Sequence, residues 1–195
     1  MVAQLGQRAP GQLDLANSDL LTQTAVGTIR GYLASAYDGG DWSGSGITSS
    51  VAQGNPNQYG IGYAAGSDPH NPRPDVPAGA VLVRPTLVGD INLDGKVNFF
   101  DITQLLGYKY NTGQPASYTD GDINYDGKVN FLDLSLLLSA NYNTGQTFSA
   151  MAAAAAATNA DITVPEPAGL AVLGIGAVGL MARRRRRGAS KGEEG

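Results

Sequence analysis

Cysteine is absent from the 195 residues, which excludes a disulfide framework and any thiolate metal or redox site. Histidine occurs once, at His70, in a polar Asp-Pro-His-Asn-Pro stretch that predicts a solvated loop residue rather than a ligand or a base. Residues 1–12 lack the apolar core of a secretory signal peptide. Glutamate first occurs at Glu166 while glycine reaches 27 residues, a bias typical of turns, loops and strands.

Acidic and basic residues are distributed unequally along the chain. Residues 1–165 contain 14 Asp against 7 Lys or Arg, which gives −7, and five consecutive arginines at residues 183–187 then add +5. The body is therefore acidic and the tail basic, although the formal net charge is only −4. We expect the folded part not to bind nucleic acid, because its charge has the same sign as the phosphate backbone.

Two copies of one acidic segment, GDINLDGKVNFFD at residues 89–101 and GDINYDGKVNFLD at residues 121–133, lie 32 residues apart. Aligning residues 89–113 with residues 121–145 gives 17 identities in 25 positions, which indicates an internal duplication. Each copy places oxygen-bearing side chains at alternate positions around a glycine, as in a loop that encloses a hard divalent cation. The repeat predicts a pair of calcium-binding loops.

An EF-hand-like loop takes ligands from its first, third, fifth, seventh, ninth and twelfth residues, the seventh through its backbone carbonyl. The predicted ligands are Asp90, Asn92, Asp94, Lys96, Asn98 and Asp101 in the first loop, and Asp122, Asn124, Asp126, Lys128, Asn130 and Asp133 in the second. Gly95 and Gly127 fill the sixth position, where the turn requires a positive φ. Three carboxylates per loop give a favourable charge balance for a hard divalent cation, and a seven-oxygen cage suits Ca²⁺ better than Mg²⁺, whose shell is smaller and octahedral, so two Ca²⁺ ions are predicted. A pair of metal-free Asp/Asn/Gly turns is the alternative.

A short helix is predicted after each loop. Apolar residues at spacings of three and four predict a buried stripe on each helix, made of Phe99, Ile102, Leu105, Leu106 and Tyr110 in the first and Phe131, Leu134, Leu137, Leu138 and Tyr142 in the second. Asn98 and Asn130 are predicted N-caps, and Asn-Thr-Gly is predicted to end each helix. Such short helices bury little alone, so we expect them to pack on each other. Val97 and Val129, at the eighth positions, are expected to join the two loops by a short backbone pairing.

Residues 1–88 are expected to form a small α+β region of unknown function. Apolar residues between Leu13 and Leu21 predict a strand or a broken strand pair, and residues 80–88 predict a strand that leads into the first loop. Residues 28–37 predict a helix with Ile29, Tyr32, Leu33 and Ala36 on one face. Residues 38–80 are rich in Gly, Ser, Pro and Asn and are predicted to loop over the surface, with Trp42 and several tyrosines able to fix them.

The duplicated segment resembles the type I dockerin domain, because the twelfth residue of each loop is Asp rather than Glu and no amphipathic helix precedes either loop. The resemblance covers about residues 89–145 and implies calcium at the twelve positions given above. Cohesin recognition does not carry over with the metal ligands, so a cohesin-like protein stays one possible partner. Many cohesin-binding dockerins have small hydroxyl residues at the tenth and eleventh loop positions, whereas Phe99-Phe100 and Phe131-Leu132 stand there. These residues are expected either to join the core or to mark a different partner.

The C-terminal segment combines Pro-Glu-Pro, an apolar run at residues 168–182 and an arginine cluster. This order resembles the PEP-CTERM sorting signal, which implies processing by an exosortase-type enzyme. The residues that carry it are Val164, Pro165, Glu166, Pro167, Arg183, Arg184, Arg185, Arg186 and Arg187. The run has 15 residues against about 20 for an ordinary membrane helix, and the arginines favour a cytoplasmic C-terminus. A nucleic-acid or nuclear-type basic run and a buried core helix are the alternatives.

The expected fold class is α+β: an N-terminal region (1–88), a dockerin-like domain (89–147), an Ala-rich linker (148–163), a sorting signal (164–187) with a short transmembrane helix (168–182), and a polar tail (188–195). No nucleophile elbow or phosphate-binding loop is visible, so we predict a protein that is not an enzyme. The predicted function is that of an exported, surface-sorted protein with a transient inner-membrane anchor. A cohesin-type assembly adaptor and an accessory fragment of a polysaccharide-degrading enzyme are the alternatives. A sorting tail without a visible signal peptide favours a gene start that lies further upstream, and signal-independent export is the alternative.

Overall fold

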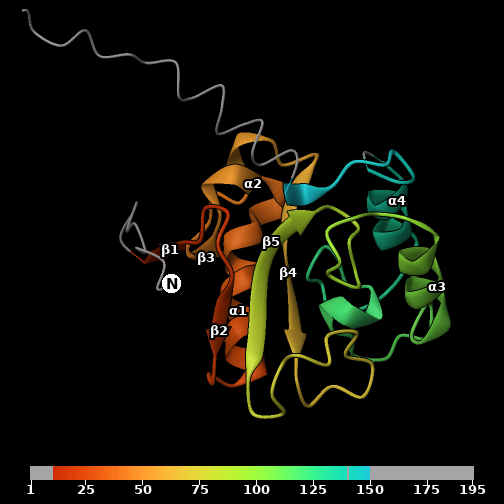
Figure 1. Ribbon diagram of the computed structural model, residues 1–195, viewed down its shortest axis with the longest axis horizontal. Helices are drawn as coiled ribbons and strands as arrows, with labels where there is room; N and C mark the ends of the chain where they lie inside the picture. The colour runs from red at the N-terminus through yellow and green to blue at the C-terminus, as the bar shows by residue number, and fades with distance from the viewer. Residues whose placement is uncertain (1–10, 140, 150–195) are drawn as a thin grey trace, which may run out of the picture. The chain divides into compact units, whose positions relative to one another are not determined.

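The computed structural model describes residues 11–149 with the exception of residue 140. Within this range the elements are β1 (Gln12–Asp14), β2 (Leu20–Thr22), α1 (Val26–Tyr37), η1 (Asp38–Gly40), β3 (Gly46–Thr48), α2 (Ser50–Gly54), β4 (Tyr59–Ala65), β5 (Val81–Leu87), α3 (Phe99–Gly107), η2 (Tyr118–Asp120) and α4 (Phe131–Ser139). Mixed helices and small sheets agree with the predicted α+β class. In Figure 1 the central strands stand between α1 and α2 on one side of the view and α3 and α4 on the other.

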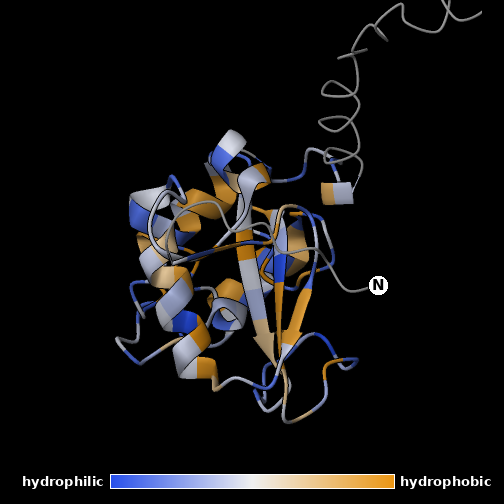
Figure 2. Ribbon diagram, turned by 90° about the vertical axis from the view of Figure 1, so that its left-hand side faces the viewer, coloured by the Kyte–Doolittle hydropathy of each residue, from blue (hydrophilic) through white to orange (hydrophobic). Residues whose placement is uncertain are grey.

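Two small sheets organise the N-terminal region. An antiparallel sheet has the order β2-β5-β4, with Tyr59 opposite Leu87 and Ala65 opposite Val81 along its longest pairing. A second, parallel pair joins β1 to β3. The broken strand pair predicted near residues 13–21 is present as β1 and β2, but its two halves join different sheets. The hydrophobic residues gather on the strands, while the connection below the sheet is largely hydrophilic (Figure 2).

The prediction that residues 38–80 loop over the surface is wrong for much of this segment. It contains β3, α2 and the seven-residue strand β4, and every residue of β4 is buried. Trp42 is also buried, as its possible anchoring role suggested. The misreading has a physical cause: Gly60 and Gly62 lower the apparent strand propensity of β4. Gly62 is required by packing, because a Cβ atom there would lie 2.4 Å from Leu93 Cδ2 and 2.5 Å from Tyr118 Cε1.

Helix α1 lies where the sequence places a helix and buries Ile29, Leu33 and Ala36. Tyr32 is the exception, since its side chain is half exposed. Helices α3 and α4 follow the two loops as predicted. The Asn98 side chain accepts a hydrogen bond from Phe100 N, and Asp101 completes a capping box. Both helices end before the Asn-Thr-Gly segments, although Asn111 and Asn143 adopt positive φ values in the turns that follow.

Only part of each predicted helical stripe is buried. Leu105 and Leu137 are fully buried at the centre of the packing, whereas the first aromatic residue of each stripe, Phe99 or Phe131, is exposed. Gly89 and Gly121, at the entrance to the loops, explain how the repeats fit together. A Cβ atom at Gly89 would lie 2.9 Å from Leu137 Cα of the other repeat, and one at Gly121 would lie 3.2 Å from Leu105 Cα. Each loop therefore begins against the helix of the opposite repeat.

The N-terminal region and the repeats share one core, and residues 11–149 belong to a single compact unit. Tyr125 of the second loop contacts the rings of Tyr37, Trp42, Tyr63 and Tyr118. The predicted boundary between residues 88 and 89 thus separates two sequence segments that complete each other's packing. Within the described range no helix is long and apolar enough to cross a membrane, and the predicted span at residues 168–182 lies outside that range.

Candidate calcium site

The two loops have the same backbone conformation. Positive φ values recur at the glycine before each loop and at the sixth position, where Gly95 has φ +87° and Gly127 has φ +90°. They also recur at the fourth position, where Leu93 and Tyr125 have φ of 59° and 63°. A bulky residue in the left-handed region is unusual and needs compensating contacts. Both side chains are buried against the N-terminal region, a role that the sequence pattern did not reveal.

The first-position aspartates lie at the bottom of the loops and are completely or almost completely buried. Asp90 Oδ2 accepts a hydrogen bond from Gly95 N at 2.9 Å, and Asp122 Oδ2 accepts one from Gly127 N at 3.0 Å. The glycine of each loop thereby folds back over its first aspartate. The other oxygens differ, since Asp90 Oδ1 accepts from Asp94 N at 3.0 Å whereas Asp122 Oδ1 is buried without a hydrogen-bond partner.

The third, fifth and ninth positions hold their side chains by the same short turns in both loops. Asn92 Oδ1 accepts from Asp94 N, Asp94 Oδ1 accepts from Lys96 N, and Asn98 Oδ1 accepts from Phe100 N. The second loop repeats these bonds at Asn124, Asp126 and Asn130, at 2.8–3.0 Å. Asx turns of this kind fix each oxygen close to the loop backbone.

The twelfth-position aspartates close the loops from the other end. Asp101 Oδ1 accepts from Ile91 N and its Oδ2 from Asn98 N, both at 2.9 Å. Asp133 makes the same pair of bonds to Ile123 N and Asn130 N, also at 2.9 Å. Each aspartate therefore joins the start of its loop to the start of the following helix. All four first- and twelfth-position carboxylates are buried next to each other in pairs.

Burial raises the pKa of these carboxyl groups. Desolvation raises the pKa of Asp90 and of Asp122 to about 7, and the paired carboxylates Asp101 and Asp133 add to the shift. Desolvation likewise raises the pKa of Asp101 to about 6 and raises that of Asp133. In each loop, ionisation of the buried carboxyl groups therefore places negative charges close together without a compensating cation. A bound cation would lower these pKa values again, because it favours the ionised form of each carboxyl group.

The residues present fit calcium by donor chemistry. In residues 11–149, no three or more Asp, Glu, His or Cys side chains converge closely enough to hold an ion by themselves. An EF-hand-like loop does not require such a cluster, because amide, backbone carbonyl and water oxygens complete the shell. The buried, unpartnered Asp122 Oδ1 is the clearest sign of a missing positive partner, since buried acceptors are almost always satisfied. The twelve predicted residues would hold two ions, and each ion would neutralise the carboxylates of its loop.

The predicted pairing between Val97 and Val129 is wrong. Val97 O instead accepts from Asn143 N at 2.9 Å, and Val129 O accepts from Asn111 N at 2.8 Å. Each loop therefore pairs with the segment that follows the helix of the other repeat, which is how tandem repeats lock into one unit.

The N-terminal region supplies contacts to both loops that sequence reasoning missed. Thr86 Oγ1 donates to Asp90 Oδ2, and Arg30 Nη2 lies 3.9 Å from Asp122 Oδ2. Arg73 Nη1 and Arg84 Nη1 both donate to Leu93 O at 3.0 Å. The Tyr125 hydroxyl donates to Ile61 O of β4. These residues lie 4 to 92 positions away from their partners and belong to no repeat or motif, so only the fold connects them.

His70 is not the solvated residue that its sequence context predicts. Its Nδ1 lies 2.8 Å from Asp120 Oδ1, and its ring stacks on Tyr108 with centroids 3.8 Å apart. Lys109 Nζ lies 2.7 Å from the other oxygen of Asp120. Because of these two partners and the backbone bond from Ser117, the pKa of Asp120 is lowered despite its burial. The cluster attaches the β4–β5 connection to the segment between the repeats.

Four large apolar residues at the tenth and eleventh loop positions are exposed. Phe99 and Phe100 are 65% and 70% exposed, and Phe131 and Leu132 are 68% and 59% exposed. Of the two roles expected for them, membership of the core is therefore excluded. Apolar side chains exposed at equivalent positions of both repeats are typical of an interaction surface.

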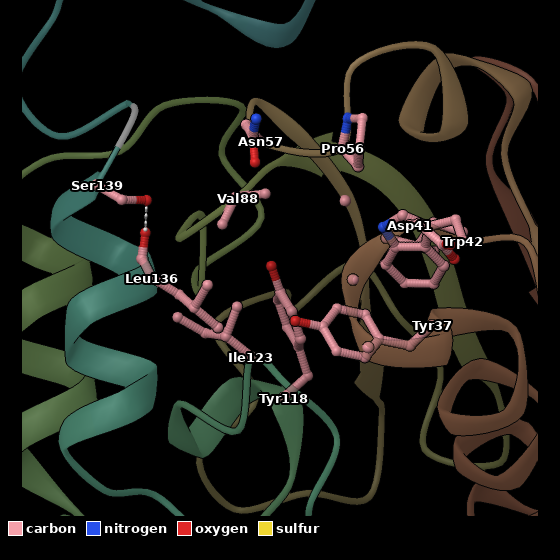
Figure 3. Close-up of a pocket in the computed structure, with 14 residues that line it drawn as sticks. Tyr37, Asp41, Trp42, Pro56, Asn57, Val88, Tyr118, Ile123, Leu136 and Ser139 are labelled. Carbon is pink, nitrogen blue, oxygen red and sulfur yellow. Dashed lines mark hydrogen bonds between the residues drawn. The ribbon is translucent and has the colours of Figure 1, made fainter.

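A cavity of about 300 Å³ lies between the end of α1, α4 and the sheet (Figure 3). Its wall is mainly aromatic and aliphatic, with Tyr37, Trp42, Val88, Tyr118, Ile123 and Leu136 among the lining residues. The Tyr118 hydroxyl points into this space. None of the twelve predicted calcium ligands lines the cavity, although Ile123, the second residue of the second loop, does.

Comparison with known families identifies two segments. Residues 88–142 match the family model of the dockerin type I domain, and residues 163–187 match that of the PEP-CTERM protein-sorting motif. These matches confirm the predicted order of a dockerin segment followed by a sorting signal. No curated protein and no solved structure matches the chain. The sorting motif falls on residues outside the described range, whereas the dockerin match covers both loops and the helices α3 and α4.

Proposed function

We propose that this chain, an exported protein in which a dockerin type I segment precedes a PEP-CTERM sorting motif, is a non-catalytic surface protein that docks a partner through calcium-held repeats. Dockerin type I domains bind calcium, which makes calcium the metal of the loops. Two ions, one per loop, follow from the two equivalent donor sets. In this proposal an exosortase-type enzyme processes the tail after residues 168–182 have held the chain in the inner membrane, with the C-terminus in the cytoplasm.

The observation that carries the docking function is the exposure of Phe99 and Phe131 at identical positions of the two repeats. Helices α3 and α4 begin at these residues, and their orientation depends on the loops in front of them. Calcium would therefore control the surface without contacting the partner, because it fixes the loops from which both helices emerge. A cohesin-like protein is the partner kind that dockerins bind, and aromatic and leucine residues in place of small hydroxyl residues favour a partner with a more apolar contact surface.

A non-catalytic role is supported by the surroundings of His70. Its Nδ1 is engaged by Asp120, and its ring is covered on one face by Tyr108. Ser117 Oγ donates toward the Asp120 and Asp68 carboxylates rather than toward the imidazole. A serine–histidine relay would need the opposite arrangement, with the imidazole between the hydroxyl and the carboxylate.

Calcium dependence is tested by thermal unfolding with and without millimolar Ca²⁺. We expect Ca²⁺ to raise the melting temperature because it binds the folded state alone. Asp90→Ala and Asp122→Ala should each remove part of the shift. A melting temperature that does not respond to Ca²⁺ in the unmodified chain contradicts the proposal.

Docking is tested by capture of partners from cell-envelope extract on the immobilised chain. A stoichiometric partner should bind in Ca²⁺, dissociate in chelator, and be lost from the Phe99→Ser/Phe131→Ser double variant. The matched control is Leu21→Ser/Tyr32→Ser, which removes two exposed apolar side chains of the N-terminal region. Equal loss in both variants would show that binding does not depend on the repeats.

A further inference from the structure

The two calcium loops are nearly identical in sequence but receive different neighbours from the N-terminal region. In both loops Oδ2 of the first aspartate accepts a hydrogen bond from the backbone N–H of the sixth-position glycine. In the first loop this oxygen also accepts the hydroxyl hydrogen of Thr86, at the end of β5. In the second loop the corresponding neighbour is the guanidinium group of Arg30, from the middle of α1.

Arg30 lies directly over the second loop. A Cβ atom at Gly127 would be 2.3 Å from Arg30 Nη2, so the glycine at the sixth position leaves room for the guanidinium group. The corresponding Cβ position at Gly95 of the first loop is open. At 3.9 Å from Asp122 Oδ2, Arg30 contributes positive charge but no directed hydrogen bond. Asp122 Oδ1 meanwhile has no hydrogen-bond partner.

We propose that Arg30 is a resident cation that opposes calcium in the second loop, and that Thr86 is a neutral positioning residue that favours calcium in the first. The inference rests on the proposed calcium binding and adds how each loop is tuned. Removing the Arg30 charge should increase the calcium affinity of the second loop for two reasons. The metal-free loop loses its compensating charge, and the calcium-bound loop loses a repulsive one.

Thr86 acts differently because its hydroxyl is uncharged. It is fully buried and holds Asp90 in the orientation that the glycine bond also requires. Neighbours that orient a metal ligand typically change metal affinity about 10- to 100-fold when removed. The N-terminal region would thus set the calcium response of both loops, although it contributes none of the twelve ligands.

The test is a Ca²⁺ titration of the chain followed by the amide resonances of Gly95 and Gly127, which report on the two loops separately. Arg30→Gln should tighten binding at Gly127 by about tenfold and leave Gly95 unchanged. Arg30→Lys keeps the charge and should stay within about twofold of the unmodified chain. Thr86→Val should weaken binding at Gly95 by about tenfold, while Thr86→Ser, which keeps the hydroxyl, should restore it.

The possible outcomes distinguish calcium binding itself from the role of Arg30. If neither glycine of the unmodified chain responds to Ca²⁺, the calcium function itself is overturned. If both respond but Arg30→Gln leaves the second loop unchanged, weakens it, or shifts both loops equally, only the role of Arg30 is overturned. The side chain of Arg30 is 36% exposed on a helix, so the glutamine variant is expected to fold; Arg30→Met is a second charge-free variant with the same expected result.

Discussion

The repeats and the N-terminal region differ in the sequence distance over which their residues hold each other. Inside a loop, the bonds that define the site span at most ten residues, as from Ile91 N to Asp101 Oδ1. In the N-terminal region the pairings are distant, with Leu20 opposite Val83 and Leu13 opposite Ile47. The conformation of each loop is therefore determined mainly by contacts between residues close in sequence. The N-terminal region instead depends on contacts between distant residues, which form only when the whole unit folds.

The difference extends to charge. The first-position carboxylates of the loops, Asp90 and Asp122, are buried and have raised pKa values, whereas Asp41 and Asp75 of the N-terminal region are exposed and have pKa values lowered by hydrogen bonds. Ionisation of these buried carboxylates thus opposes folding, and a bound cation would compensate for it. The N-terminal region has no such need, and it supplies positive and hydrogen-bonding partners to the loops instead.

The largest expected effect is a reversal of the pH dependence of stability by calcium. In chelator, the folded state binds more protons than the unfolded state between about pH 4 and pH 7, because the pKa values of Asp90 and Asp122 rise from 3.8 to about 7. The free energy of unfolding should therefore fall as the pH rises through this window.

With saturating Ca²⁺ the free energy of unfolding should instead increase as the pH rises, since Ca²⁺ binds the ionised carboxylates and competes with protons. Melting temperatures at pH 5 and pH 7.5, with chelator and with Ca²⁺, check both halves. A melting temperature in chelator that is higher at pH 7.5 than at pH 5 would contradict the assignment of buried, metal-dependent carboxylates.

The next effect concerns the packing between the two regions at β4. Gly62→Ala should lower the free energy of unfolding by about 1–3 kcal/mol, because the added methyl group meets Leu93 and Tyr118. Gly60→Ala is the matched control on the same strand, since its Cβ would make ordinary contacts of 3.6 Å or more. Chemical denaturation measures both. Equal losses for the two variants would mean that β4 does not pack on the first loop.

A smaller effect is expected at the hydroxyl groups of two buried tyrosines. Tyr125→Phe removes the bond to Ile61 O, leaves that carbonyl without its donor, and should lower the free energy of unfolding by about 1–2 kcal/mol. Tyr118→Phe removes a hydroxyl that faces the cavity and should change the free energy of unfolding by less than about 0.5 kcal/mol. Denaturation curves of the two variants decide the comparison, and a larger loss for Tyr118→Phe would refute it.

A further small effect is expected at His70, which joins the β4–β5 connection to the repeats. His70→Ala should cost less than about 1 kcal/mol, because the side chain is 30% exposed and water can replace it. Hydrogen exchange should nevertheless increase at amides of this connection, such as Val76 N, which donates to Arg73 O. Amides of α1 serve as the control, and an equal increase there would indicate global rather than local loosening.

The local conformation of the two loops was largely predictable because the information for it is local. Alternating oxygens, the sixth-position glycines and the asparagine caps each act within a dozen residues, and the structure holds the side-chain oxygens at these positions by the same bonds in both loops. The predicted burial of Phe99 and Phe131, the first residues of the two helical stripes, was wrong. In each nine-residue helix only the aspartate of the first turn and one leucine are buried, so the aromatic residue that begins the helix stays exposed.

The sequence by itself determined the duplicated loops, the helices behind them and the class of metal, since these follow from short-range spacing and the chemistry of oxygen ligands. Tertiary structure alone decided which distant residues meet the loops, with Arg30 at Asp122 and Ile61 at Tyr125. It also decided that the segment at residues 38–80 provides a buried central strand. The reason is physical. A single residue's role in a long-range contact depends on where its partner is carried by the fold, and no periodicity along the chain records that position.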